Sequence, residues 1–154
     1  MFIYTTLALR IFGLAGVIGS LIFICGDLLY NHVSSSAESP ASKMGKMAPS
    51  RLLAAGSAGL VGCWFYLLGV GHICLAFRPA GDVFAFILMA AFIAVMVGYG
   101  VAHTAYFAIG AGAQTARKAG LDMEEGGRLG NALFGRLSVI TYLPVVVSSL
   151  MMIY

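Results

Sequence analysis

Long apolar stretches without charged residues dominate the chain, and short polar segments separate them. In the longest stretch, no charged residue lies between Asp82 and Arg117. The part from Val83 to Ala113 would span roughly 46 Å as a helix, more than the ~30 Å hydrocarbon core of a bilayer. Three further stretches have the same character. The pattern predicts an all-α integral membrane bundle of four transmembrane helices, at about residues 9–31, 52–77, 83–112 and 130–153.

Composition leads to the same class. Of the 154 residues, 60% are hydrophobic and 10% are charged, whereas a soluble domain has about 25% charged residues. So little polar surface excludes a soluble globular protein, and we expect one transmembrane domain over residues 1–154 in a lipid bilayer. A cleaved signal peptide, with Arg10 before the apolar run Ile11–Cys25, is the less favoured alternative, because the apolar character continues to Tyr30.

The basic residues indicate how the chain crosses the membrane. Seven of the nine Lys and Arg residues lie in or beside the loops 33–51 and 114–129, namely Lys43, Lys46, Arg51, Arg117, Lys118, Arg128 and Arg136. Arg10 and Arg78 lie on the opposite side. The positive-inside rule then places both loops in the cytoplasm and both termini outside. The net charge of +3 is small and the basic residues cluster in loops, so we expect no nucleic-acid partner.

The connecting segments carry turn and helix-end residues. A short interfacial helix is expected between Ser42 and Met47, and segment 114–128 reads as a charged loop with a short amphipathic helix. The sequence Arg78-Pro79-Ala80-Gly81-Asp82 predicts a tight turn, so the second and third spans should be antiparallel neighbours. Pro144 lies inside the fourth span and predicts a kink there.

Glycine recurs at regular spacing in the first two spans. Each span has glycines at positions i, i+3 and i+6 and one more seven residues later, which gives Gly13, Gly16, Gly19, Gly26, Gly56, Gly59, Gly62 and Gly69. Small residues allow transmembrane backbones to approach closely, where van der Waals contact drives association. We therefore expect glycine-mediated helix packing. A duplicated hairpin, as found in transporters, is the alternative interpretation.

A polar stripe within the third span is the candidate functional site. Spacings of four and three residues place Tyr99, His103 and Tyr106 on one helical face, and Gly110 continues it. A polar stripe in lipid must face protein or water. Counting residues from the helix ends brings Asp27 and Tyr30 to a similar depth, with Ser138 and Thr141 from the fourth span. The predicted ligand-binding residues are Asp27, Tyr30, Tyr99, His103, Tyr106 and, as a rim charge, Arg136.

Each of these residues also has a structural interpretation. His103 could be a neutral imidazole that bonds to a neighbouring helix, as polar side chains do in membrane bundles. Asp27 could reach interfacial water. The tyrosines Tyr4, Tyr30 and Tyr154 resemble interfacial belt residues, and Trp64, Tyr66 and His72 read as packing or rim residues. The three cysteines are expected to be small packed thiols, and they are Cys25, Cys63 and Cys74.

No cofactor or metal is predicted. The cysteines form no C-x-x-C pair and the histidines have no metal-ligand spacing. His72 and His103 differ in depth by roughly 20 Å, too far for the two axial ligands of one haem. Gly126-Gly127-Arg128-Leu129-Gly130 lacks the Lys-Ser/Thr ending of a phosphate loop.

Three hypotheses about function remain. In the first, the chain binds or transports a small or lipophilic ligand at the polar site, with a link to protons through His103. In the second, it is a membrane enzyme of isomerase or transferase type, with Asp27, His103 and Tyr106 as acid and base on a lipid-like substrate. In the third, it is an accessory subunit whose glycines Gly13, Gly16 and Gly19 face a partner.

The overall plan resembles that of small four-span bacterial inner-membrane proteins, which implies that location and no particular activity. We also expect a homo-oligomer or a partner membrane subunit, because four helices leave little interior for a cavity of their own. Whether the chain is an enzyme stays open at this point.

Overall fold

Four long helices make up most of the computed structural model, which describes residues 6–31 and 38–153. Within those segments, the helices long and apolar enough to cross a membrane are α1 (Thr6–Asn31), α3 (Pro49–Phe77), α4 (Asp82–Lys118) and α5 (Met123–Ile153). The short helix α2 (Pro40–Lys46) precedes α3, and the 3₁₀ turn η1 (Arg78–Ala80) joins α3 to α4. The prediction of an all-α membrane bundle with four spanning helices is confirmed.

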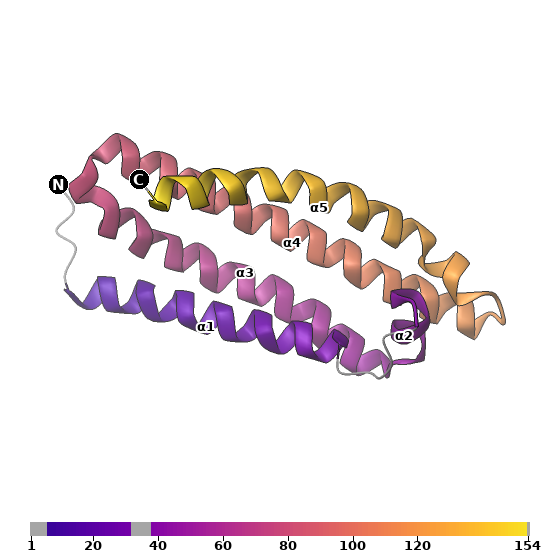
Figure 1. The fold of residues 1–154 in the computed structure, drawn as a ribbon. Coiled ribbons are helices and arrows are strands. Elements are labelled where there is room, and N and C mark those ends of the chain that lie inside the picture. The colour runs from indigo at the N-terminus through magenta and orange to yellow at the C-terminus, as the bar shows by residue number, and fades with distance from the viewer. Residues whose placement is uncertain (1–5, 32–37, 154) are drawn as a thin grey trace.

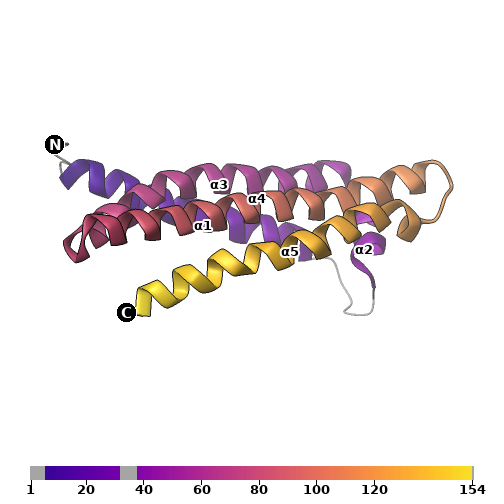
Figure 2. The same cartoon turned by 90° about the horizontal axis from the view of Figure 1, so that it is seen from above.

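The four long helices lie side by side in the order α1, α3, α4, α5, and each packs against the next (Figure 1). The N-terminal end of α1, the turn η1 and the C-terminal end of α5 lie at one end of the bundle. The helix α2 and the α4–α5 turn lie at the other end. Toward its C-terminus, α5 diverges from the other helices (Figure 2). The bundle is therefore closed at the α2 end and more open at the other.

Glycines bring α1 and α3 into backbone contact. A Cβ atom on Gly69 would lie 2.7 Å from the Cα atom of Gly16, and one on Gly19 would lie 3.0 Å from the carbonyl oxygen of Gly62. Gly13 packs against the ring of His72. The predicted glycine-mediated packing is confirmed, and these α1 glycines face α3 instead of an outside partner.

The two sets of glycines do not occupy equivalent places. On α3, Gly56 and Gly59 lie under the rings of Phe107 and His103 from α4, whereas Gly62 lies under Phe23 from α1. The glycines of α3 thus contact two neighbouring helices, α1 and α4, whereas those of α1 contact α3 alone. Their common spacing reflects close packing on both helices and gives no support to a duplicated hairpin.

The connection between α4 and α5 is shorter than predicted. Helix α4 continues to Lys118 and α5 already begins at Met123, so most of segment 114–128 is helical. Gly120 adopts a φ of 70°, and the Leu121 N–H donates to the Ala116 carbonyl at 2.8 Å, which ends α4 in a Schellman motif. The prediction of a loop was wrong because charged residues also occur at helix ends. Arg117 and Lys118 are favourable in the last turn of α4, and Glu124 and Glu125 are favourable in the first turn of α5.

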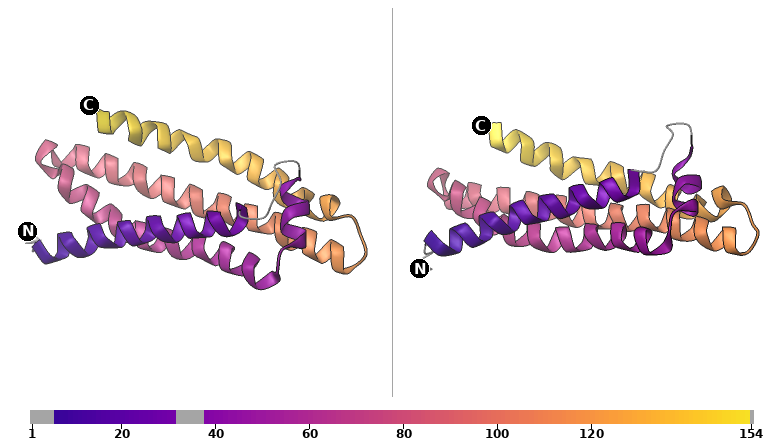
Figure 3. Two further views of the ribbon diagram at one scale, coloured as in Figure 1. Left: turned by 60° about the horizontal axis from the view of Figure 1, so that its bottom comes forward. Right: turned by 90° about the horizontal axis from the view of Figure 1, so that it is seen from below.

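Helix α2 lies across the ends of α4 and α5 (Figure 3). The Oγ atom of Ser39 caps its N-terminus by accepting from the Ser42 N–H at 3.1 Å. At the other end, the Gln114 amide donates to the carbonyls of Met44 (3.1 Å) and Met47 (3.0 Å). The predicted short helix is confirmed, and side chains of α4 satisfy the carbonyls that it would otherwise leave open.

The hydrophobic core cluster lies directly beneath α2. Its buried members come from α1 to α4, and they are Tyr30, Ala41, Met44, Met47, Leu52, Ala55, Ile109 and Ala113. Tyr30 is 3% exposed, so its interpretation as an interfacial belt residue is wrong. Tyr4 and Tyr154 lie outside the described residues. The reason for the error is packing between helices, because the Tyr30 ring lies against the rings of His103 and Tyr106 of α4.

The three cysteines differ in how far they are buried. Cys63 is buried and its thiol donates to the Met96 carbonyl at 3.4 Å, but Cys25 is exposed on α1, so the prediction of packed thiols is wrong for Cys25. Cys74 is half-buried.

Pro144 lies inside α5, which the structure shows as one uninterrupted helix, and a kink there stays a prediction.

We predict that Gly112→Ala destabilises the bundle whereas Gly135→Ala does not. A Cβ atom on Gly112 would lie 2.1 Å from the backbone oxygen of Gly126, so α4 and α5 would have to separate. Overpacking of this kind costs about 1–3 kcal/mol. A Cβ atom on Gly135 meets nothing within 4 Å. Thermal unfolding of both variants in detergent measures the difference, and equal midpoints would contradict the close α4–α5 contact.

Candidate functional site

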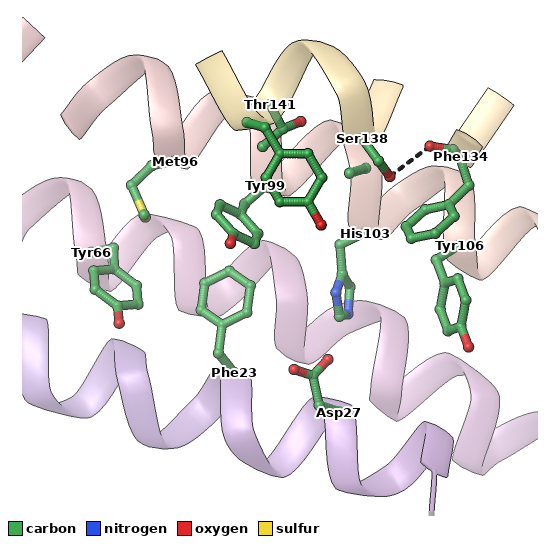
Figure 4. Close-up of a pocket in the computed structure, with 12 residues that line it drawn as sticks. Phe23, Asp27, Tyr66, Met96, Tyr99, His103, Tyr106, Phe134, Ser138 and Thr141 are labelled. Carbon is green, nitrogen blue, oxygen red and sulfur yellow. Dashed lines mark hydrogen bonds between the residues drawn. The ribbon is translucent and has the colours of Figure 1, made fainter. Parts of the chain in front are cut away.

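A cavity of about 670 Å³ lies among the four long helices. Its volume falls in the ~300–1,000 Å³ range of small-molecule pockets. The lining residues come from α1, α3, α4 and α5, and they are Phe23, Asp27, Tyr66, Met96, Tyr99, Ala102, His103, Tyr106, Phe134, Ser138, Thr141 and Tyr142. Figure 4 shows them around the common space. The expectation that four helices leave little interior for a cavity is therefore wrong.

The polar stripe of α4 forms one wall of this cavity. Tyr99, His103 and Tyr106 all line it. Gly110, the fourth member of the stripe, packs instead beneath α2, where a Cβ atom would lie 2.6 Å from Leu52 Cδ1. The stripe thus faces the cavity over its first two turns and the core beyond them.

His103 is fixed by α3 on one edge of its ring. Its Nε2 atom lies 3.2 Å from the Ala55 carbonyl oxygen. Because a carbonyl only accepts, Nε2 carries the hydrogen, and Nδ1 of the neutral ring is then an acceptor. A Cβ atom on Gly59 would lie 2.0 Å from Cδ2. The Cδ2–Nε2 edge therefore rests on α3, and His103 both bonds to a neighbouring helix and lines the cavity.

Asp27 reaches the cavity from α1. It lies four residues after Phe23, which places both side chains on the same helical face. Between them in the chain, Gly26 packs so closely on α3 that a Cβ atom would lie 2.9 Å from the Cβ of Ala58. In Figure 4 the Asp27 side chain points up from α1 and the His103 ring points down from α4 into the same space. The predicted proximity in depth of Asp27 and His103 is confirmed.

Tyr30 lies behind this wall. Its ring centroid is 5.3 Å from that of His103 and 5.1 Å from that of Tyr106, and the second pair meets edge to face. Its hydroxyl is buried and has no hydrogen-bond partner among the described residues. Tyr30 therefore supports two cavity residues from the core side, and it is not itself among the lining residues.

Arg136, like Tyr30, is a predicted site residue that does not line the cavity. It is exposed on α5 and is absent from the lining. Ser138 and Thr141, which were expected at a similar depth, do line it. Their hydroxyls donate to the carbonyls of Phe134 (2.7 Å) and Leu137 (2.8 Å), one turn earlier in the same helix.

Sequence reasoning placed Ser138 and Thr141 of α5 at the depth of the site but missed Phe134, Tyr142 and most of the aromatic wall. Phe134, Ser138 and Thr141 follow the spacing i, i+4, i+7, the same as Tyr99, His103 and Tyr106. That match was the available signal. Tyr66, interpreted as a packing or rim residue, also lines the cavity, and its hydroxyl lies 2.6 Å from Ser20 Oγ. His72, by contrast, bonds to the Leu9 carbonyl at 3.1 Å, far along α3 from this site.

The chemistry of the wall is aromatic with few polar atoms. Phe23 and Tyr66 pack with ring centroids 5.6 Å apart, and Tyr106 and Phe134 with centroids 5.0 Å apart. One carboxylate, one imidazole and several hydroxyls interrupt these rings. In the described part of the chain, no three His, Cys, Asp or Glu side chains gather as metal ligands would.

Comparison with known proteins gives a family and no activity. The model of a family of unknown function, DUF6796, matches residues 4–153. The chain belongs to this family, whose match covers all four spanning helices. No curated protein and no solved structure matches it significantly. What the cavity does must therefore be argued from its own residues.

We predict opposite effects from removing two tyrosine hydroxyls. Tyr30→Phe removes a buried hydroxyl that lacks a partner, so stability is expected to stay constant or rise by up to ~1 kcal/mol. Tyr66→Phe breaks the 2.6 Å contact with Ser20 and is expected to lower stability by about 1 kcal/mol. Thermal unfolding in one detergent compares the two. A loss for Tyr30→Phe would show that its hydroxyl is bonded after all.

Proposed function

We propose that this membrane protein binds a small lipophilic ligand in the cavity between its helices. The observation that carries the proposal is a cavity of about 670 Å³ with an aromatic wall and a carboxylate and an imidazole set into it. Ligand sites typically combine a mostly apolar lining with a few polar groups that fix orientation. Ionisable side chains inside a membrane span are expensive to maintain, which makes Asp27 and His103 functional candidates.

The open side of the cavity favours entry from the bilayer. Two lining residues, Tyr99 and Tyr142, are 44% and 65% exposed. They lie in the membrane-spanning parts of α4 and α5, so their exposed surfaces face lipid. At the α2 end, Tyr106 and Phe134 pack against the hydrophobic core cluster and separate the cavity from the loops. This geometry supports lateral access, and a transport or proton-linked step remains a further prediction.

A membrane enzyme acting on a lipid-like substrate is the second candidate. Asp27, His103 and Tyr106 all line one cavity, so an acid and a base would meet the same bound molecule. Proton transfer in such a site needs the transferring atoms within hydrogen-bond reach of the substrate. Binding is common to both candidates and is therefore the property to test first.

We further propose that the protein lies in a bacterial inner membrane with both termini outside. Six of the basic residues that support this orientation belong to the α2 end of the bundle, namely Lys43, Lys46, Arg51, Arg117, Lys118 and Arg128. The N-terminal end of α1, the C-terminal end of α5 and η1 lie together at the opposite end. A homo-oligomer or a partner subunit stays part of this proposal. The cavity removes the earlier reason for it, which was that four helices leave little interior space.

Ser138→Trp is expected to abolish ligand binding because the indole fills the cavity, whereas Val139→Trp is the matched control. Ser138 lines the cavity, and its neighbour Val139 is 71% exposed on the lipid-facing side of α5. Native mass spectrometry of the gently extracted protein measures co-purifying small molecules or lipids. The proposal requires a defined ligand on the wild type and on Val139→Trp, and at least a tenfold lower occupancy on Ser138→Trp.

The two histidines provide a second control in the same experiment. His103→Ala and His72→Ala each remove one bond to a carbonyl of a neighbouring helix, at 3.2 Å and 3.1 Å respectively. His103→Ala alone alters the cavity wall, so it alone should lose the ligand. Equal occupancy in both variants, or none in the wild type, would contradict a ligand site at His103.

Alkaline phosphatase fused after Tyr154 in a bacterial host tests the orientation. The enzyme is active outside the inner membrane, so the fusion should be at least tenfold more active than one placed after Gly120. Green fluorescent protein at the same two positions should give the reverse pattern. Gly120 lies in the turn between α4 and α5, at the α2 end. An inactive C-terminal phosphatase would reverse the proposed orientation.

A further inference from the structure

We propose that the ligand is a lipophilic organic cation, whose charged group is held by Asp27 within the aromatic wall. This inference rests on the proposed binding function and specifies the chemical class of the ligand. Three features of the cavity carry it: the charge of its lining, the direction of its hydrogen bonds and the position of its rings.

The lining has one formally charged residue at neutral pH, and its charge is negative. Asp27 is the single Asp, Glu, Lys or Arg among the twelve lining residues. Asp27 is exposed on α1 at the edge of the cavity. A carboxylate attracts a nearby cation and repels an anion, by an energy that grows as the local dielectric constant falls. A phosphate or carboxylate headgroup would meet this like charge, whereas an ammonium group would complement it.

Three polar groups of the wall direct their hydrogens to backbone carbonyls. Ser138 and Thr141 use their hydroxyl hydrogens on carbonyls of their own helix, at 2.7 and 2.8 Å. His103 directs its Nε2 hydrogen to the Ala55 carbonyl, so the neutral ring offers Nδ1 as an acceptor. These three groups therefore offer acceptors to a ligand, whereas the hydroxyls of the four lining tyrosines can donate or accept. A ligand that carries positive charge fits the carboxylate and these acceptors.

Aromatic rings lie near the position of the carboxylate. Phe23 lies on the same face of α1, one turn before Asp27, and its ring centroid is 5.9 Å from that of His103. In Figure 4 the rings of Phe23 and Tyr99 and the Asp27 carboxylate border one space. Aromatic faces attract cations within about 6 Å of the ring centroid, most strongly where water is excluded. The rings therefore add to the charge preference of the carboxylate.

Two probe ions that match in size and shape and differ in the sign of charge test this preference. Tetraphenylphosphonium is a lipophilic cation and tetraphenylborate is a lipophilic anion. Equilibrium binding of each is measured on the full-length protein in an uncharged detergent, and binding to Ser138→Trp is subtracted as the micelle background. The wild type is expected to bind the cation at least tenfold more tightly than the anion.

Asp27→Asn is expected to weaken phosphonium binding at least tenfold and to leave borate binding unchanged or stronger. Asp82→Asn is the matched control, because Asp82 pairs with Arg78 at 2.8 Å in the η1 turn, at the other end of the bundle. If Asp27→Asn fails to fold, Asp27→Glu keeps the charge and should keep the preference. The comparison of the two ions on the wild type requires no variant.

The outcomes separate this inference from the function on which it rests. Equal binding of both ions that Ser138→Trp abolishes would overturn the cation inference and leave a lipophilic cavity intact. The same holds if Asp27→Asn and Asp82→Asn behave alike. Binding of neither probe above the Ser138→Trp background, together with no co-purifying ligand, would overturn the proposed function itself.

Discussion

Close approach of helix backbones at glycine is the constraint on which this bundle depends. Between helices in a bilayer there is little hydrophobic driving force, so van der Waals contact must hold them together. α1 meets α3 where Gly16 and Gly69 touch, and α5 meets α4 where Gly112 and Gly126 touch. Gly130, where a Cβ atom would lie 2.5 Å from the Ile109 nitrogen, extends the second contact.

The position of the cavity follows from where these contacts lie. The glycines of α5 that touch α4 belong to its first turns, near α2, and beyond them the two helices are separated by larger side chains. At one such place the side chain of Thr141 on α5 packs against Gly98 on α4. Three atoms of that side chain lie 3.1–3.4 Å from the position that a Cβ atom on Gly98 would take. On the other edge, α1 is bound to α3. The polar stripe of α4 and the cavity lie between α1 and α5, the two helices at the edges of the bundle.

The sequence predicted the helices, the glycine contacts and half of the site because these depend on local pattern. Tyr99, His103 and Tyr106 share a face by spacing alone, and counting from helix ends placed Asp27 at their depth. The contribution of α5 depends on the rotation of a helix that is apolar on several sides, and hydropathy does not fix that rotation. The burial of Tyr30 depends on its packing against His103 and Tyr106 of α4, and hydropathy does not predict that contact. Charged residues beside a turn did not distinguish a loop from two helix ends.

The core beneath α2 has a consequence for how a bound molecule would be exchanged. Tyr106 and Phe134, both half-buried, belong to the cavity wall and to the layer packed on that core, so they lie between the cavity and the α2 end. Under the proposed lateral access, a bound molecule exchanges with the hydrocarbon phase. The concentration that sets occupancy is the mole fraction of ligand in the bilayer, and an apparent aqueous affinity contains the partition coefficient of the ligand. A very lipophilic molecule would saturate the protein at a low aqueous concentration even if its contacts in the cavity were weak.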